Sequence, residues 1–252
     1  MPRYDFRTPR LFVESPLGSG ADVALGRDQA NYLLNVLRLR AGAEILVFNG
    51  RDGEWRATFA AAGKKAMRLA VGERTRAQTA AGDLHYLFAP LKHARLDYMV
   101  QKAVEMGASR LQPIITRHCQ VQRVNLARMR ANAIEAAEQC GILAIPEVEP
   151  PLAFDAFVRG WVPERLLVFC DEDADAKDPV EALAAGRDDA LVGPTPVSLL
   201  VGPEGGFAEE ERAALMALPN VLRLALGPRI LRADTAAVAA LTLVQAVLGD
   251  WR

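Results

Sequence analysis

Cysteine is scarce in this 252-residue chain, and its three cysteines (Cys119, Cys140 and Cys170) never form a C-x-x-C pair. Three scattered cysteines predict neither a disulfide framework nor a structural zinc site. The sequence also lacks a run of about 18 uncharged apolar residues, which a membrane-spanning helix needs. The N-terminal stretch MPRYDFRTPR is charged and has no apolar segment of the kind that signal peptides contain. We therefore expect a cytoplasmic protein with no membrane anchor and no bound metal.

Net charge is also small, −1 at pH 7, but the charges are unevenly distributed. Residues 1–80 carry 13 basic and 8 acidic residues, whereas the rest of the chain carries 17 and 23. A locally basic surface on a nearly neutral protein is compatible with a polyanionic partner such as RNA. Ordinary solvated faces of an arginine-rich protein are the alternative interpretation.

Residues 1–74 predict a small and mostly β domain. Strand-like runs alternate with turn formers, among them the Asn-Gly and Asp-Gly steps of NGRDG, which tolerate positive φ. One helix is expected in RDQANYLLNVLRLRAG, where an apolar stripe recurs at helical spacing: Ala30, Leu33, Leu34 and Leu37. A polar stretch at about residues 75–82 is interpreted as a linker to a second domain.

Residues 83–252 predict an α/β domain. This part of the chain contains five nearly continuous apolar segments, which are typical of parallel strands buried on both faces: LHYLFAP, RLQPIIT, RLLVFCDE, VSLLVG and VLRLALG. Helical patterns separate them; Asn125 is expected to cap one helix, and Asp234 or Thr235 the last. That last helix, TAAVAALTLVQAVL, is apolar nearly all round, which indicates burial in a core or in a subunit interface.

Two of the expected strands end in Gly-Pro, in SLLVGPEGGF and LALGPRILRADTA. Ligands of parallel α/β sheets bind beyond the carboxyl ends of the strands. Glycine lets the backbone approach a ligand closely, and proline stiffens the turn. Neither phosphate-binding glycine motif is present, so a ligand held through a polyphosphate is not expected. Alternatively, each Gly-Pro pair has the purely structural role of ending its strand.

Four segments follow the small basic β domain: LLVGPEGGF, LALGPRILRADTA, LDYMVQKAVEMGASRLQPI and EAAEQCG. In these segments nearly the whole chain resembles the RsmE family of bacterial ribosomal RNA methyltransferases, within the SPOUT class. The resemblance implies an N-terminal PUA-like β-barrel that binds RNA. It also implies a C-terminal SPOUT domain whose parallel sheet contains a deep trefoil knot. The implied activity is S-adenosylmethionine-dependent methylation of N3 of a uridine in small-subunit (16S) ribosomal RNA, by a homodimer.

The resemblance further implies which residues act. Backbone groups of two loops would hold the cofactor: Leu200, Val201, Gly202, Pro203, Glu204, Gly205 and Gly206 in the first, and Leu226, Gly227, Pro228, Ile230 and Leu231 in the second, with Thr235 beyond it. Methyl transfer from a sulfonium needs no metal and depends largely on positioning. Loss of the uridine N3 proton leaves negative charge that a guanidinium could stabilise. Arg232 is expected in this role first, and Arg229 second.

Contact with the RNA backbone is expected from scattered cations: Arg3, Arg7, Arg10, Arg38, Arg40, Lys92 and Arg95. Two positions depart from the family pattern. Relatives usually place an arginine after EQCG, where this chain has Ile142, and the usual R-T-E-T reads R-A-D-T here. Asp234 keeps the negative charge of the usual glutamate, so we expect its role to survive.

Two other functions are compatible with these patterns. Another SPOUT enzyme would modify tRNA or a ribose 2′-OH. A non-catalytic RNA-binding ribosome-assembly factor would bind the cofactor without turnover on any RNA. A small-molecule methyltransferase would leave the basic N-terminal domain without a purpose.

Overall fold

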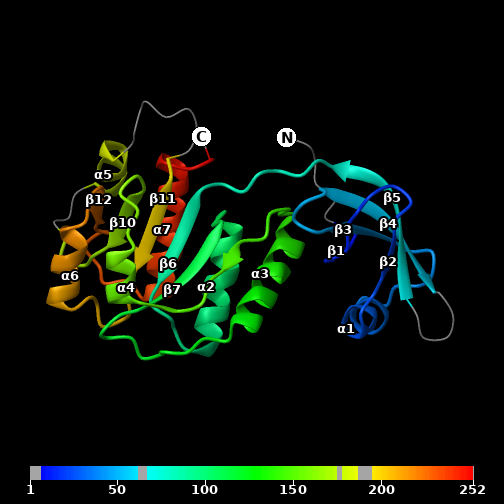
Figure 1. The fold of residues 1–252 in the computed structure, drawn as a ribbon, viewed down its shortest axis with the longest axis horizontal. Helices are drawn as coiled ribbons and strands as arrows, with labels where there is room; N and C mark the ends of the chain where they lie inside the picture. The colour runs from blue at the N-terminus through cyan, green and yellow to red at the C-terminus, as the bar shows by residue number, and fades with distance from the viewer. Residues whose placement is uncertain (1–6, 62–66, 175–177, 187–194, 252) are drawn as a thin grey trace. The chain divides into compact units, whose positions relative to one another are not determined.

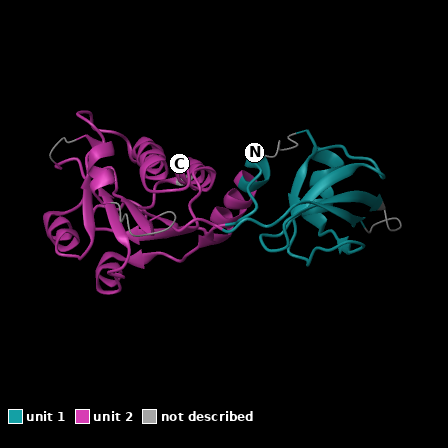
Figure 2. Cartoon of the chain, turned by 90° about the horizontal axis from the view of Figure 1, so that it is seen from above, with its two compact units in different colours: residues 1–80, 137–145 teal, residues 81–136, 146–252 magenta. Residues whose placement is uncertain are grey.

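The computed structural model describes residues 7–61, 67–174, 178–186 and 195–251. The chain divides into two compact units, shown in different colours in Figure 2. The first comprises residues 1–80 and 137–145, and the second comprises residues 81–136 and 146–252. Arg3, one of the cations expected to bind RNA, lies outside the described residues.

The first unit is built on a five-stranded sheet with the strand order β1-β3-β4-β5-β2 (Figure 1). All pairings are antiparallel except that of β1 with β3. A short helix and a π-helical segment follow β2. The elements are β1 (Arg10–Phe12), β2 (Asp22–Ala24), α1 (Arg27–Asn31), η1 (Tyr32–Val36), β3 (Glu44–Phe48), β4 (Glu54–Ala61) and β5 (Met67–Arg76).

The apolar stripe expected on the helix of the first unit does face its core. Leu33 is fully buried, and Leu34 and Leu37 pack against the same cluster, which includes Ile45, Val47, Phe59 and Leu69. The helix is not one regular α-helix, however. It changes to π-helical turns after Asn31, the Leu37 N–H donates to the Tyr32 carbonyl, and Arg38 follows with φ of 56°.

A buried ion-pair cluster ties β1, β4 and β5 to residues 137–145. The Glu54 carboxylate pairs with Arg10 at 2.8 Å and with Arg76 at 2.5 Å. Burial alone would raise the pKa of Glu54, but hydrogen bonds from Arg76, Thr75 and Arg10 outweigh it, and the pKa is lowered. The carboxylate therefore stays ionised between its two arginines.

The same two arginines also satisfy backbone carbonyls around the C-terminus of helix α3 (Leu126–Cys140). Arg10 donates to the carbonyls of Ala137, Glu138 and Ile142, and Arg76 donates to that of Gly141. The last carbonyls of a helix lack intrahelical partners and carry partial negative charge, so guanidinium groups suit them. The Arg10 side chain is only 7% exposed. The expectation that Arg10 contacts RNA is therefore wrong, because its guanidinium is used inside the fold.

The second unit contains a parallel sheet with the order β12-β10-β11-β6-β7-β8, and β9 pairs with β7 (Figure 1). Its elements are β6 (Leu84–Phe88), α2 (His93–Glu105), β7 (Arg110–Ile115), β8 (Glu147–Val148), β9 (Leu152–Ala153), α4 (Phe154–Arg159), β10 (Leu166–Cys170), α5 (Pro179–Ala185), β11 (Val197–Val201), α6 (Glu209–Met216), β12 (Val221–Leu224) and α7 (Ala233–Val247), besides most of α3.

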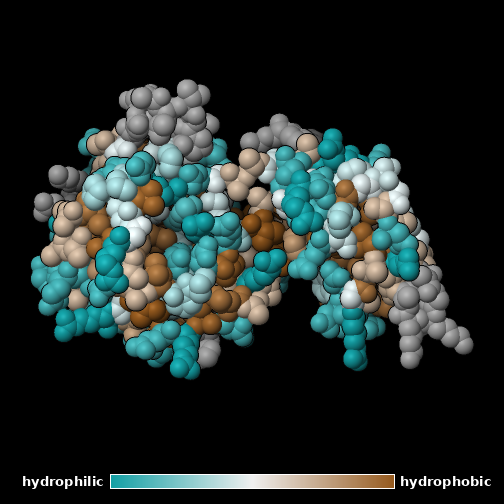
Figure 3. Space-filling view, in the orientation of Figure 1, coloured by the Kyte–Doolittle hydropathy of each residue, from teal (hydrophilic) through white to brown (hydrophobic). Residues whose placement is uncertain are grey.

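Helices cover this sheet. Side chains of α4 and α6 join Leu87, Leu167, Phe169 and Leu200 in one apolar cluster. Helix α7 packs against α2, α5 and β11. On the face visible in Figure 3, apolar residues lie among hydrophilic ones over this unit. Among the described residues, no helix has the length and apolar character needed to cross a membrane.

The α/β fold with a parallel sheet is thus confirmed, while the trefoil knot stays a prediction. Asn125 caps α3 as expected, because its side-chain oxygen accepts the Arg128 N–H at 3.0 Å. The expected cap of α7 is wrong. That helix begins at Ala233, so Arg232 occupies the N-cap position without a side-chain cap bond. Asp234 instead lies in the first turn and accepts the Thr235 N–H at 2.9 Å.

Candidate functional site

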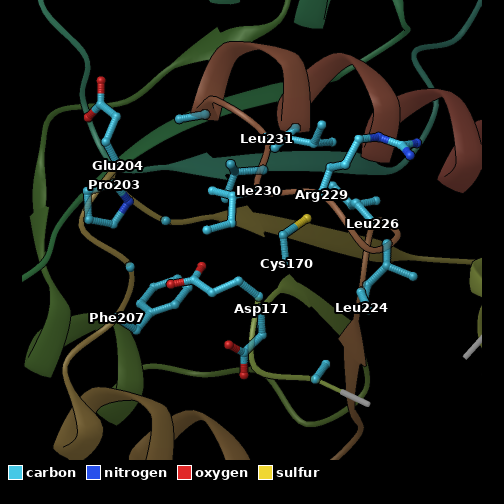
Figure 4. A pocket seen from close by; sticks show the side chains of 18 of the residues that line it. Cys170, Asp171, Pro203, Glu204, Phe207, Leu224, Leu226, Arg229, Ile230 and Leu231 are labelled. Carbon is cyan, nitrogen blue, oxygen red and sulfur yellow. The ribbon is translucent and has the colours of Figure 1, made fainter. Parts of the chain in front are cut away.

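A pocket of about 400 Å³ lies at the carboxyl ends of β10, β11 and β12. Figure 4 shows Pro203 and Glu204 on one side, Leu226 and Arg229 on the other, and Cys170 between them. Three segments supply the lining: residues 170–172 with 174, residues 201–207, and residues 224–231 with Ala233 and Ala236. The volume is in the range of sites for small organic ligands, which are about 300–1,000 Å³.

The first loop, residues 202–207, folds into a tight turn in which the Gly206 N–H donates to the Pro203 carbonyl at 3.0 Å. Gly206 has φ of 67°, a conformation that side chains other than glycine rarely adopt. A Cβ on Gly202 would lie 2.9 Å from the ring of Phe207, closer than carbon atoms can pack. Phe207 is itself fixed edge-on against Phe169 in the apolar cluster.

Side chains from outside hold this loop as well. The Nδ1 atom of His118, which follows β7, lies 3.1 Å from the Gly205 carbonyl oxygen and 3.2 Å from that of Gly206. Since both oxygens are acceptors, Nδ1 must carry the hydrogen. The buried Glu211 carboxylate accepts the backbone N–H groups of Arg117 and Ala208, which joins the His118 segment to the start of α6.

A third brace is an ion pair between Arg95 on α2 and Glu204 in the loop, with 2.9 Å between Nη1 and Oε1. Both side chains are partly exposed, 46% and 36%. Arg95, expected from the sequence to contact RNA, is thus bound to the loop that lines the pocket.

The second loop, residues 226–231, is held much less. Within the described part of the chain, none of its side chains makes a hydrogen bond or an ion pair. Gly227 has φ of 93° with open space around it. Ile230 is 91% exposed although it lines the pocket. Arg229 also lines the pocket, whereas Arg232 lies just beyond it at the start of α7.

The third wall, at the end of β10, is the part of the pocket that the sequence patterns missed. The Asp171 side chain is fully buried, and two guanidinium groups hold it: Arg212 at 3.2 Å and Arg223 at 2.8 Å. Burial, with the nearby Asp171 charge, raises the pKa of the Cys170 thiol to about 12, so the thiol is neutral. Glu172 follows and faces the pocket. The sequence does contain a signal for this wall, because an Asp-Glu pair comes directly after an apolar strand.

Most of the residues expected at the cofactor site line this pocket: Val201, Gly202, Pro203, Glu204, Gly205, Gly206, Leu226, Gly227, Pro228, Ile230 and Leu231. Two do not. Leu200 is buried in the apolar cluster beneath α4 and α6, and Thr235 is exposed on the first turn of α7. Of the expected RNA contacts, Arg7, Arg38, Arg40 and Lys92 are exposed. No group of His, Cys, Asp and Glu that could hold a metal occurs among the described residues.

Comparison with known proteins assigns the two units. A family model described as an RNA methyltransferase domain matches residues 77–245, and one described as an RNA methyltransferase PUA domain matches residues 25–73. The parallel sheet with its pocket thus defines the class: an RNA methyltransferase with a PUA domain.

Relatives over the full length are more specific. The chain is 30% identical to ribosomal RNA small subunit methyltransferase E of Synechocystis sp., covering 95% of this chain and 78% of the relative. It is 28% identical to the Rickettsia conorii enzyme of that name, over 94% of both chains. The crystal structure of the enzyme of that name from Neisseria gonorrhoeae, bound to S-adenosyl methionine, is 27% identical, with a TM-score of 0.82 over 98% of this chain and 100% of that one. The chain belongs to the ribosomal RNA small subunit methyltransferase E family, as the sequence motifs predicted.

Proposed function

We propose that this protein methylates N3 of a specific uridine in small-subunit (16S) ribosomal RNA, with S-adenosylmethionine as the methyl donor. The observation that supports this most directly is the pocket at the carboxyl ends of β10, β11 and β12. Both glycine-proline loops line it, in a chain whose relative from Neisseria gonorrhoeae binds S-adenosyl methionine.

The pocket fits this cofactor in size and in the kind of groups that surround it. Backbone atoms of residues 202–206 and 226–231 are accessible because the loops contain glycines and prolines, and the remaining walls are mainly apolar. Such loops can hold a purine and a methionine chain through amide and carbonyl groups. When bound, S-adenosylmethionine supplies a methyl group activated by the adjacent sulfonium.

The chain's own contribution to the reaction is positioning and charge. Arg232 and Arg229 lie at or next to the second loop, and both are exposed. Their guanidinium groups would stabilise the negative charge on the uracil ring once the N3 proton is lost to solvent. Charge stabilisation of this kind acts most strongly where water is excluded, which RNA docking over the pocket would achieve.

RNA binding is assigned to the PUA-like unit, with Arg7, Arg38 and Arg40, and to Lys92 on the second unit. Arg38 is informative because its φ of 56° is strained for any residue but glycine or asparagine. Arg38→Gly should therefore fold at least as stably as the wild type, while RNA affinity falls. Filter binding at several salt concentrations, beside thermal unfolding, measures both. Unchanged RNA affinity would remove Arg38 from the interface.

A cytoplasmic homodimer is the proposed working form. Ile230 at 91% and Tyr98 at 45% exposure are large apolar side chains, and Ile230 lies beside the pocket. A second copy covering them would complete the wall on the side of the loosely held loop. Light scattering should give twice the chain mass, and a monomer at micromolar concentration would contradict the dimer.

The experiment that tests the activity is mass spectrometry of nucleosides from small-subunit ribosomal RNA. Cells lacking the gene should lack 3-methyluridine, the wild-type gene should restore it, and Arg232→Ala should not. If another methylated nucleoside disappears instead, the substrate is a different RNA position. If none disappears, the non-catalytic assembly factor becomes the better interpretation.

A further inference from the structure

The pocket contains one carboxylate whose charge nothing in the described structure balances. Asp171 is neutralised by Arg212 and Arg223, Asp173 by Arg212 and Glu204 by Arg95. Glu172 lies between the two aspartates and makes no hydrogen bond or ion pair with any other described residue. An acidic side chain left free in this way is available to a ligand.

The neighbours of Glu172 hold it at the pocket wall. Asp171 is fixed by two guanidinium groups and by its own N–H, which donates to the Leu224 carbonyl at 3.1 Å. The Asp173 N–H donates to an Asp171 carboxylate oxygen at 3.2 Å. Opposite, a Cβ on Gly206 would overlap the Glu172 carboxylate. The backbone on both sides of Glu172 is thus anchored, and its carboxylate lies against the first loop.

We propose that the Glu172 carboxylate accepts hydrogen bonds from the ribose hydroxyl groups of the cofactor, an inference that rests on the proposed function. Strand β10 pairs in parallel with β11, which leads into the glycine-rich loop. A carboxylate at the end of a strand beside such a loop binds the ribose in dinucleotide-binding sheets, for the same geometric reason. Two carboxylate oxygens suit two adjacent hydroxyl donors.

The other cofactor groups that could attract a carboxylate are the sulfonium and the amino group. A carboxylate at the sulfonium would stabilise the reactant more than the transition state, because the positive charge disappears as the methyl group leaves. Placement at the ribose carries no such cost. A carboxylate at the ribose would also bind the reactant and the product, S-adenosylhomocysteine, equally.

Calorimetric titration tests the assignment without RNA. The ligands are S-adenosylmethionine, S-adenosylhomocysteine and the 2′-deoxy and 3′-deoxy forms of S-adenosylhomocysteine. The proteins are the wild type, Glu172→Ala and Glu172→Gln, with Glu210→Gln as the matched control. Glu210 is an exposed carboxylate on α6 that does not line the pocket. Thermal unfolding of each variant establishes that the fold is intact.

Hydrogen bonds to a charged group predict that Glu172→Ala binds S-adenosylhomocysteine about 10-fold or more weakly. Each deoxy ligand should bind wild type more weakly than the parent does. Each should also lose less affinity than the parent on Glu172→Ala, because it keeps only one of the two hydroxyl groups. Glu172→Gln should be intermediate and Glu210→Gln unchanged.

Three outcomes would overturn the proposal: unchanged affinity in Glu172→Ala, an equal loss for the parent and deoxy ligands, or a loss for S-adenosylmethionine alone. If wild type binds none of these ligands, the proposed function itself fails.

Discussion

The two loops that line the pocket both contain a Gly-Pro step, but they differ in how the protein holds them. His118, Arg95 and the Phe207 ring all fix the first loop. The second has an exposed isoleucine and arginine, and among the described residues its side chains make no hydrogen bond or ion pair. The first loop is therefore preorganised for a ligand that binds to this chain alone. The second has the character of a surface that a further molecule completes, either a second copy or the RNA.

The largest effect should come from the loosely held side. Arg232→Ala should lower the rate of RNA methylation about 100- to 1,000-fold, as removal of a charge-stabilising group does. Cofactor affinity should stay near that of the wild type, because Arg232 does not line the pocket. Single-turnover methylation of small-subunit RNA, beside calorimetry, separates the two quantities. Retained activity would assign the role to Arg229 or to neither arginine.

Glycine replacement in each loop sharpens the comparison. Gly202→Ala places a Cβ 2.9 Å from the buried Phe207 ring, and overpacking of this kind costs about 1–3 kcal/mol. Cofactor affinity should fall about 10-fold or more. Gly227→Ala meets no neighbour, and only its φ of 93° is unfavourable. Since that loop is free to relax, the loss should be smaller, and equal losses would contradict the difference in bracing.

His118→Ala removes the donor to two loop carbonyls, which predicts about 2- to 10-fold weaker cofactor binding. The KM for the cofactor should rise while kcat at saturation is kept, because His118 acts through the loop. His118→Asn offers an N–H near the position of Nδ1 and should recover part of the affinity. If both variants are equally impaired, His118 has another role.

The smallest effect is expected for the exposed pair of Arg95 and Glu204, since such pairs contribute about 0.2–1 kcal/mol. Arg95→Ala and Glu204→Gln should weaken cofactor binding equally, less than about 5-fold, and high salt should remove the effect. Only Arg95→Ala should also reduce RNA affinity if Arg95 contacts RNA. A double-mutant cycle on the cofactor affinity measures the pair itself.

The sequence allowed the sheet and both loops to be predicted because apolar strands ending in Gly-Pro leave a strong local pattern. Contacts between distant segments leave none. Arg10 lies 44 residues before its partner Glu54, so the sequence alone does not distinguish it from an exposed cation. Nothing in the sequence around His118, which precedes a cysteine, indicates its contact with the first loop. The acidic stretch after Asp173 contains the short helix α5, whose Leu183 is buried.

The cluster of Glu54, Arg10 and Arg76 has a consequence for how this chain is made. Its two arginines also donate to carbonyls of residues 137–142, which are synthesised about 60 residues after the last strand of the first unit, Met67–Arg76. The first unit therefore cannot complete its fold as it leaves the ribosome, although domains commonly fold in order of synthesis. Until then Glu54 can pair with Arg10 and Arg76, but the two guanidinium groups lack their carbonyl acceptors in residues 137–142. A protein that we propose modifies ribosomal RNA would thus have its RNA-binding part finished only after translation has passed well into the catalytic part.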